Sequence, residues 1–206
     1  KMKLMNDINK RITGLAMNGA QFACATADRD IVVGQRDQVS DLIVLNGHEK
    51  LVNKLALVND NYVVSSAEDG TLRLWNLETK KSTKYQTKYT MSWELTSPKS
   101  HVIVEKDERN IVVLSIPDFS PIKTISSKTY CLSPDGGYLV FSSNDNCVRL
   151  FDLKNNKEVM VLHGHTSEIV TLKTNDDGSL IISASSDGAI KIWEKKDDRW
   201  ILKRNI

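Results

Sequence analysis

A stretch of 13 residues that occurs twice constrains the fold more than any other feature. The copies run from Val63 to Trp75 and from Ile181 to Trp193. In each, two apolar residues and a serine lead to Asp-Gly, and alternating apolar residues lead on to tryptophan. A Gly-His pair precedes each copy, at 47–48 and at 164–165. A chain that repeats one motif in this way is expected to repeat one structural unit.

Three weaker copies stand in the same frame. Asp28, Arg109 and Asp145 occupy the place that Asp69 and Asp187 hold in the two full copies, and these five markers are 41, 40, 36 and 42 residues apart. Repeats of about 40 residues with several short strands are typical of propeller arrays. The repeats expected are 1–40, 41–80, 81–119, 120–157 and 158–199, followed by a surplus strand at 200–206.

Each repeat is expected to contribute four short strands. Apolar runs alternate with turn sequences such as Glu68-Asp69-Gly70 and Ser133-Pro134-Asp135-Gly136, which suit tight hairpins. A single sheet with two apolar faces is not stable alone, so the sheets must stack on one another. The sequence therefore predicts an all-β chain of four-stranded antiparallel sheets.

The number of outer strands indicates that the array is incomplete. The segments 1–5 and 200–203 both look like fourth-strand sequences, so five repeats carry six such strands. A closed ring of five sheets needs only five. The chain also opens on Lys1 and not on an initiator methionine. We therefore expect a segment of a larger propeller, with the remaining sheets supplied by further chain or by a partner.

The order Gly-His, serine, turn aspartate and tryptophan resembles the WD-repeat family of β-propellers. The resemblance implies a ring that is commonly seven-bladed, of which this chain would be a segment. It also implies that four side chains in a blade form a hydrogen-bonded structural tetrad. By position, the two tetrads are His48, Ser65, Asp69 and Trp75, and His165, Ser183, Asp187 and Trp193.

The other three repeats depart from this pattern. Gly34 and Phe151 stand where tryptophan is expected, and the repeat around Arg109 ends at Ser115. Losing one member of a tetrad leaves the other polar groups buried without partners, at a cost of roughly 1–3 kcal/mol each. We therefore expect the blades without a tetrad to deform more easily.

Composition favours a folded protein without a strong preference for polyanions. Hydrophobic residues make up 40% of the 206 residues, and 28 basic against 26 acidic residues give a net charge of +2. No apolar run is long enough to span a membrane.

Three cysteines without paired spacing, Cys24, Cys131 and Cys147, argue against a disulfide framework. We expect an intracellular protein, cytoplasmic or nuclear.

Two groups of residues have a chemical as well as a structural interpretation. His163 and His165 with Asp187 show a ligand spacing known from metal sites. His48, Ser65 and Asp69 have the composition of a catalytic triad, but no strained nucleophile turn or oxyanion hole accompanies them. The structural interpretation is favoured for both. We expect no catalytic residue, metal or cofactor.

Basic stretches leave a second class of function open. They contain Lys80, Lys81, Lys84 and Lys88, and Lys195, Lys196, Lys203 and Arg204. Lysines on solvated strand edges discourage edge-to-edge pairing, which is the favoured interpretation. The alternative is a propeller that binds RNA or acidic lipid through these edges, although no aromatic residues are interleaved with them.

A non-catalytic scaffold or sensor that binds other proteins or peptides within a larger assembly is the function that the resemblance implies. Its partners could include other domains of the same longer chain. In the family, the loops before each first strand and the turns between second and third strands build the top face. Here they contribute Glu49, Lys50, Glu68, Thr166, Ser167, Ser186, Asn144, Arg29 and Arg109.

Overall fold

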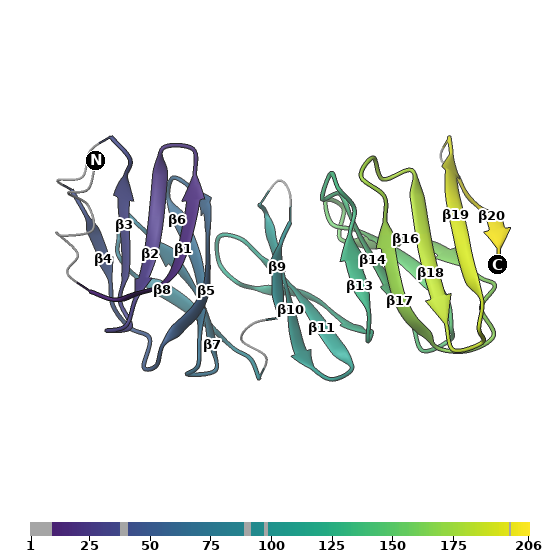
Figure 1. The fold of residues 1–206 in the computed structure, drawn as a ribbon, viewed down its shortest axis with the longest axis horizontal. Helices are drawn as coiled ribbons and strands as arrows, with labels where there is room; N and C mark the ends of the chain where they lie inside the picture. The colour runs from purple at the N-terminus through teal and green to yellow at the C-terminus, as the bar shows by residue number, and fades with distance from the viewer. Residues whose placement is uncertain (1–9, 38–40, 89–91, 97–98, 198) are drawn as a thin grey trace. The chain divides into compact units, whose positions relative to one another are not determined.

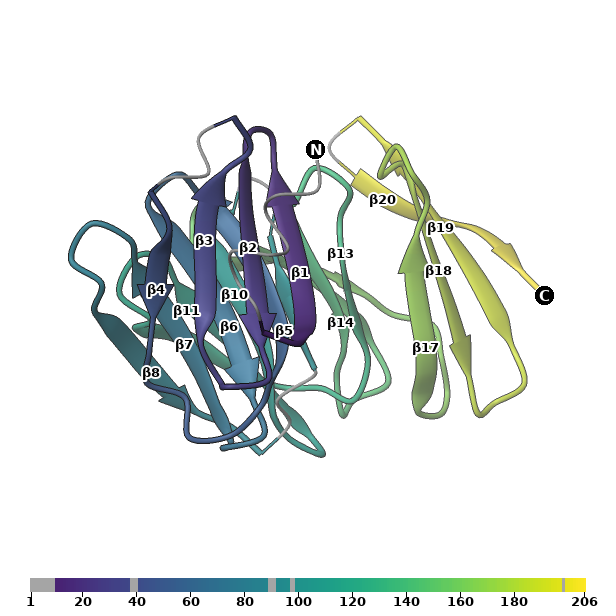
Figure 2. The same cartoon turned by 60° about the vertical axis from the view of Figure 1, so that its left-hand side comes forward.

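The computed structural model describes residues 10–37, 41–88, 92–96, 99–197 and 199–206. These residues form five four-stranded antiparallel sheets. In each sheet, strands that follow one another along the chain lie side by side (Figures 1 and 2). The expected all-β fold is therefore confirmed. The described residues contain no helix, and so none that could cross a membrane.

The sheets are numbered 1 to 5 along the chain. Sheet 1 contains β1 (Ile12–Asn18), β2 (Gln21–Thr26), β3 (Ile31–Gln35) and β4 (Ile43–Leu45). Sheet 2 contains β5 (Val52–Asn59), β6 (Tyr62–Ala67), β7 (Thr71–Asn76) and β8 (Ser82–Gln86). Sheet 3 contains β9 (Trp93–Leu95), β10 (His101–Asp107), β11 (Asn110–Ser115) and β12 (Pro121–Ser126). Sheet 4 contains β13 (Tyr130–Leu132), β14 (Tyr138–Ser142), β15 (Val148–Asp152) and β16 (Lys157–Leu162). Sheet 5 contains β17 (Ile169–Thr174), β18 (Leu180–Ser185), β19 (Ile190–Lys196) and β20 (Arg199–Asn205).

The predicted repeats are offset from these sheets by one strand. From residue 41 on, each predicted repeat begins with the outer strand of one sheet and continues with three strands of the next. The expected surplus strand at 200–206 falls largely within β20, which pairs with β19 through contacts such as Lys195 with Trp200. The structure thus places it as the fourth strand of sheet 5. The other outer-strand sequence, residues 1–5, lies outside the described residues.

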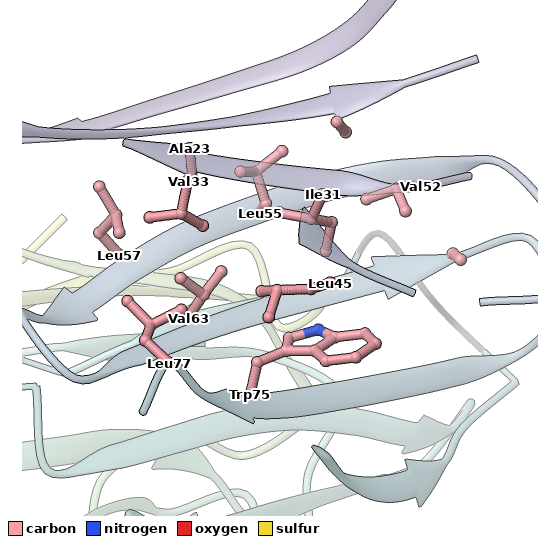
Figure 3. Packing of buried hydrophobic residues seen from close by; sticks show 12 residues of the cluster. Ala23, Ile31, Val33, Leu45, Val52, Leu55, Leu57, Val63, Trp75 and Leu77 are labelled. Atoms are coloured by element: carbon pink, nitrogen blue, oxygen red, sulfur yellow. The ribbon is translucent and has the colours of Figure 1, made fainter. Parts of the chain in front are cut away.

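The chain divides into two compact units, and each has its own core. Unit 1 comprises 1–95 and 115–120, and unit 2 comprises 96–114 and 121–206. In unit 1, sheets 1 and 2 bury apolar side chains against each other, with the indole of Trp75 beside Leu45 and Val63 (Figure 3). In sheet 2, β6 is buried on both faces, as expected for a strand of a sheet that lies within a stack.

Unit 2 has two such cores. One joins sheets 3 and 4 through residues including Ile103, Val113 and Phe151. The other joins sheets 4 and 5 through residues including Val140, Ile181 and Trp193. Sheet 4 is therefore apolar on both faces, as the sequence of β14 and β15 requires. These layers hold the loops at the ends of the sheets, where the candidate site lies.

Candidate functional site

His48, Ser65, Asp69 and Trp75 are joined in one buried hydrogen-bond network. Nε1 of Trp75 donates to Oγ of Ser65 over 2.7 Å. Oγ of Ser65 lies 2.8 Å from Nε2 of His48, and Nδ1 of His48 lies 2.8 Å from Oδ2 of Asp69. Because the carboxylate can only accept and the serine has one proton to give, a neutral imidazole protonated at Nδ1 satisfies every group.

The surroundings of this network favour that protonation state. Burial lowers the pKa of His48 below its usual value, against the opposing effect of the hydrogen bond to Asp69. Burial acts to raise the pKa of Asp69, but hydrogen bonds from Thr71, the Glu49 amide and His48 outweigh it and hold that pKa far below its ordinary range. The result is a neutral histidine beside a carboxylate.

The second network has the same connections and is less tight. Nε1 of Trp193 donates to Ser183 over 3.0 Å, and Ser183 lies 2.9 Å from Nε2 of His165. The distance from Nδ1 of His165 to Oδ2 of Asp187 is 3.3 Å, against 2.8 Å for the His48–Asp69 pair. Several hydrogen bonds lower the pKa of Asp187, and the bond from the backbone amide of Thr166 has the largest effect.

Each network also holds a loop at the end of its sheet. The amide of Glu49 donates to Asp69 over 2.9 Å, and that of Thr166 donates to Asp187 over 2.8 Å. Glu49 and Thr166 are two of the residues that the sequence places on the partner-binding face. The tetrads therefore couple the sheet interior to the first residue of the candidate binding loops.

The other candidate residues of unit 1 lie around the Glu49 loop. Nη1 of Arg29 donates to the Glu49 carbonyl over 3.1 Å, which links a turn of sheet 1 to the loop before β5. The amide of Glu68 donates to the carbonyl of Leu51. Lys50 is exposed in the same loop. The structure thus brings Arg29, Glu49, Lys50 and Glu68 to one end of sheets 1 and 2.

In unit 2, two candidate residues line a pocket of about 220 Å³. They are Arg109, after β10, and Asn144, after β14. The pocket also contains Lys128 and Glu168, which form an ion pair of 2.6 Å. Its remaining lining residues are Ser142, Ser143 and Asn146. The pocket is open to solvent and polar, and carries two cationic side chains against one carboxylate.

The other candidate residues of unit 2 border this pocket. The amide of Ser186 donates to the carbonyl of Glu168, and Oγ of Ser185 donates to the carbonyl of Ser167. These bonds hold the loop that precedes β17. Thr166, Ser167 and Ser186 are therefore next to Glu168 in one loop cluster at the end of sheet 5.

Sequence reasoning missed Lys128 and Glu168. Both lie in the loop before a first strand, which is the place that Glu49 and Lys50 hold before β5. Because the Gly-His pair is missing before β13, no motif set the position of Lys128 within its repeat. Glu168 follows Gly-His at the regular spacing, so counting three residues beyond His165 was a usable signal.

Sheets 1 and 4 have apolar residues or cysteine in the places of the tetrad serine and tryptophan. In sheet 1, Cys24 takes the place of the tetrad serine, and Gly34 that of the tryptophan. Phe22 pairs with Gly34 across the strands, and its ring fills the space there: a Cβ on Gly34 would lie 2.6 Å from it. In sheet 4, Phe141 and Phe151 hold the two places, and both are buried.

A second buried tryptophan interaction lies on the other face of β6. Nε1 of Trp93 donates to Oγ of Ser66 over 2.9 Å, and the ammonium of Lys54 lies 4.4 Å from the centre of the Trp93 ring. Ser65 and Ser66 thus accept indole N–H groups on opposite faces of one strand. Trp93 belongs to no motif of the repeat, so this contact could not be predicted from the spacing of motifs.

The geometry argues against the chemical interpretations of both residue groups. Ser65 is completely buried and is held by Trp75 and His48, so its hydroxyl cannot meet a substrate. His163 lies 3.1 Å from Sγ of Cys147 and not beside Asp187. Within the described ranges, no group of three or more His, Cys, Asp or Glu could hold a metal ion.

Comparison with known proteins agrees with this architecture. The model of the "WD domain, G-beta repeat" family matches residues 40–76, 119–152 and 156–194, together more than half of the chain. The chain belongs to the WD-repeat family. Its sheets are therefore WD blades, and the family is generally non-catalytic and generally mediates protein interactions. Two of the three matches contain the tetrads described above.

Several curated WD-repeat proteins are similar to this chain. Mouse cilia- and flagella-associated protein 57 is 29% identical over 153 residues, which is 68% of this chain and 12% of that protein. Human serine-threonine kinase receptor-associated protein is 26% identical over 73% of the chain and 44% of its own length. Rat apoptotic protease-activating factor 1 is 23% identical over 82% and 14%. The chain thus spans less than half the length of these relatives.

Proposed function

We propose that this WD-repeat chain is part of an intracellular protein-interaction scaffold, and that the pocket around Arg109 and Lys128 anchors an acidic residue of the partner. The observation that carries the proposal is the pocket itself. Two cationic side chains face one carboxylate in a polar hollow of about 220 Å³, at the loop end of blades 3 to 5.

The chemistry of the pocket suits a peptide side chain with negative charge. Lys128 is half-exposed and already paired with Glu168, so an incoming carboxylate can exchange with that partner. Arg109 offers a planar fork that matches a carboxylate or phosphate group. The amides and hydroxyls of Ser143, Asn144 and Asn146 supply further donors and acceptors around it. Such a mixture resembles the polar surroundings of an anchor residue in a protein interface.

The names of two relatives point to assemblies of proteins. One is named as associated with a serine-threonine kinase receptor, and another as activating an apoptotic protease. The three free cysteines are all buried, which fits a reducing compartment. These features support a scaffold or sensor role in the cytoplasm or nucleus.

Affinity purification with matched variants tests the proposal. The intact protein, its Arg109→Glu/Lys128→Glu variant and a Lys123→Glu/Lys154→Glu control are expressed with the same tag. The control makes the same change in net charge on exposed positions outside the pocket. We expect at least one protein to be retained by the wild type and the control, and to be depleted about tenfold or more from the pocket variant.

Two outcomes would overturn this function. If the pocket variant recovers every partner as well as the wild type does, the pocket does not bind them. Retention on heparin or on phosphatidylserine vesicles that falls steeply with salt and depends on Lys80, Lys81 and Lys84 would favour the alternative, RNA or acidic lipid binding. In the other basic stretch, Lys196 and Lys203 form ion pairs with Glu194, which reduces the charge available to a polyanion.

A further inference from the structure

A second pocket lies at the opposite end of blades 4 and 5. It is formed where β13 turns into β14, β17 into β18, and β19 into β20, so it is separated from the Arg109 loops by the length of a sheet. Its volume is about 240 Å³. Its charged and aromatic lining residues are Asp135, Tyr138, Asp177, Lys195, Asp197 and Trp200.

The turns of the two blades present their aspartates in the same manner. Oδ1 of Asp135 accepts from Oγ of Ser133 over 2.6 Å and from the Gly137 amide over 3.0 Å. Oδ1 of Asp177 accepts from Asn175 and from the Ser179 amide, over 2.8 and 2.7 Å. The Ser179 side chain also donates a hydrogen bond to the Asp177 carboxylate. For Asp135, no hydrogen bond within the described part of the chain reaches Oδ2, so one oxygen of this carboxylate fixes the turn and the other remains open to a ligand.

Both carboxylates are charged at neutral pH. Hydrogen bonds, led by the Ser133 hydroxyl, lower the pKa of Asp135, and those led by Ser179 lower the pKa of Asp177. With Asp197, the pocket holds three carboxylates and one ammonium, that of Lys195. The excess of negative charge favours a cation over an anion.

The aromatic wall agrees with this sign of charge. Nζ of Lys195 lies 5.8 Å from the centre of the Tyr138 ring, so a cation of the protein itself already lies over one aromatic ring of the pocket. Trp200, on β20, is half-buried and lines the same space. Indole is the most favourable aromatic partner for a cation. The combination of carboxylate oxygens and aromatic rings suits a planar guanidinium.

We propose that this pocket binds an arginine side chain of a partner protein. The guanidinium would pair with Oδ2 of Asp135 and with the carboxylate of Asp177, and stack on Trp200. The inference rests on the proposed function only in that the ligand belongs to a protein, and it needs none of the residues around Arg109. Its test uses small probes, so that either proposal can fail without the other.

The probe is N-acetyl-arginine amide, added to the ¹⁵N-labelled full chain and followed by NMR at the Trp200 indole N–H and the Ser179 amide. N-acetyl-citrulline amide has nearly the same shape without the charge and is the matched control ligand. We expect the arginine probe to shift both signals and to bind at least about tenfold more tightly than the citrulline probe, as the loss of a charge-assisted pair implies.

Three variants locate the interaction. In Asp177→Asn the amide oxygen can keep the turn, and we expect about fivefold to tenfold weaker binding. Asp176→Asn makes the same charge change one residue away, outside the pocket lining, and should alter affinity by less than about twofold. Lys195→Gln removes the competing ammonium and should strengthen binding. This last variant keeps the proposal testable if Asp177→Asn does not fold.

Several results would overturn the proposal. One is that the citrulline probe binds as tightly as the arginine probe. Another is that Asp176→Asn weakens binding of the arginine probe as much as Asp177→Asn does. The third is that Lys195→Gln binds the arginine probe more weakly than the wild type. Binding of N-acetyl-aspartate amide that is lost in Lys195→Gln would instead identify an anion pocket.

Discussion

At the scale of single residues, the serine of the tetrad is the link between the indole and the imidazole. Ser65 accepts the Trp75 N–H and contacts His48, so its removal leaves two buried polar groups without a partner. In blade 4, the hydroxyl of the buried Ser142 makes one hydrogen bond to the described residues, of 3.3 Å with Oγ of Ser127.

We therefore expect Ser65→Ala to lower the free energy of unfolding by about 2–3 kcal/mol, because each orphaned group costs roughly 1–3 kcal/mol. Ser142→Ala, an equally small change at a buried serine, should cost less than about 1 kcal/mol. Urea unfolding monitored by tryptophan fluorescence measures both. Equal costs for the two variants would contradict a cooperative role for the tetrad.

The buried His48 predicts how the stability of the protein depends on pH. Its folded-state pKa lies below its unfolded-state value, so between the two values the unfolded chain binds the additional proton and stability rises with pH. Stability should consequently fall as the pH is lowered from about 7 to 5, since free histidine titrates near 6.5. His48→Gln should make this fall shallower, and part of it should persist because burial lowers the pKa of His101 as well. An unchanged slope in the variant would refute the assignment.

At the scale of elements, the eroded blades keep their packing by exchanging one side chain for another. In blade 1 the absent tryptophan is compensated by Phe22, whose ring occupies the space over Gly34. In blade 2 the corresponding cross-strand pair is Val63 with Trp75. The Phe22–Gly34 pair is smaller than the Val63–Trp75 pair, but its aromatic ring comes from the neighbouring strand and fills the space over the glycine.

This exchange predicts that Phe22 and Gly34 are energetically coupled. Gly34→Ala alone should destabilise the chain by about 1–3 kcal/mol, because the new Cβ would meet the Phe22 ring and Leu42. In a Phe22→Val background the same substitution should cost at least about 1 kcal/mol less, since contacting residues are not additive. A double-mutant cycle from denaturant unfolding gives the coupling. Additive effects would mean that the two positions do not share this space.

The unequal blades also predict unequal protection from hydrogen exchange. Blades 1 and 2 pack into one core, but only blade 2 has a tetrad. Amides in β6 and β7 should exchange more slowly than those in β2 and β3, and Ser65→Ala should accelerate exchange in blade 2 first. Mass spectrometry of peptic fragments resolves these strands. Slower exchange in β2 and β3 would show that the tetrad does not decide local stability.

At the scale of the whole molecule, the sequence determined the architecture and only part of the candidate site. The repeat of strands and turns is local, so five four-stranded sheets and the tetrad positions could be predicted from spacing. Lys128 and Trp93 could not, because each belongs to a segment in which the motif is eroded and the frame is lost. The pocket of Asp177 and Trp200 depends on two blades packing together, which no single repeat encodes.

The most direct test of the scaffold function is the affinity of the purified partner for the matched charge variants. The partner retained in affinity purification is titrated against the wild type, Arg109→Glu/Lys128→Glu and Lys123→Glu/Lys154→Glu. We predict a Kd at least about tenfold weaker for the pocket variant, equivalent to about 1.4 kcal/mol, and a change of less than about twofold for the control. Equal affinities for all three proteins, or equal weakening in both variants, would contradict binding through this pocket.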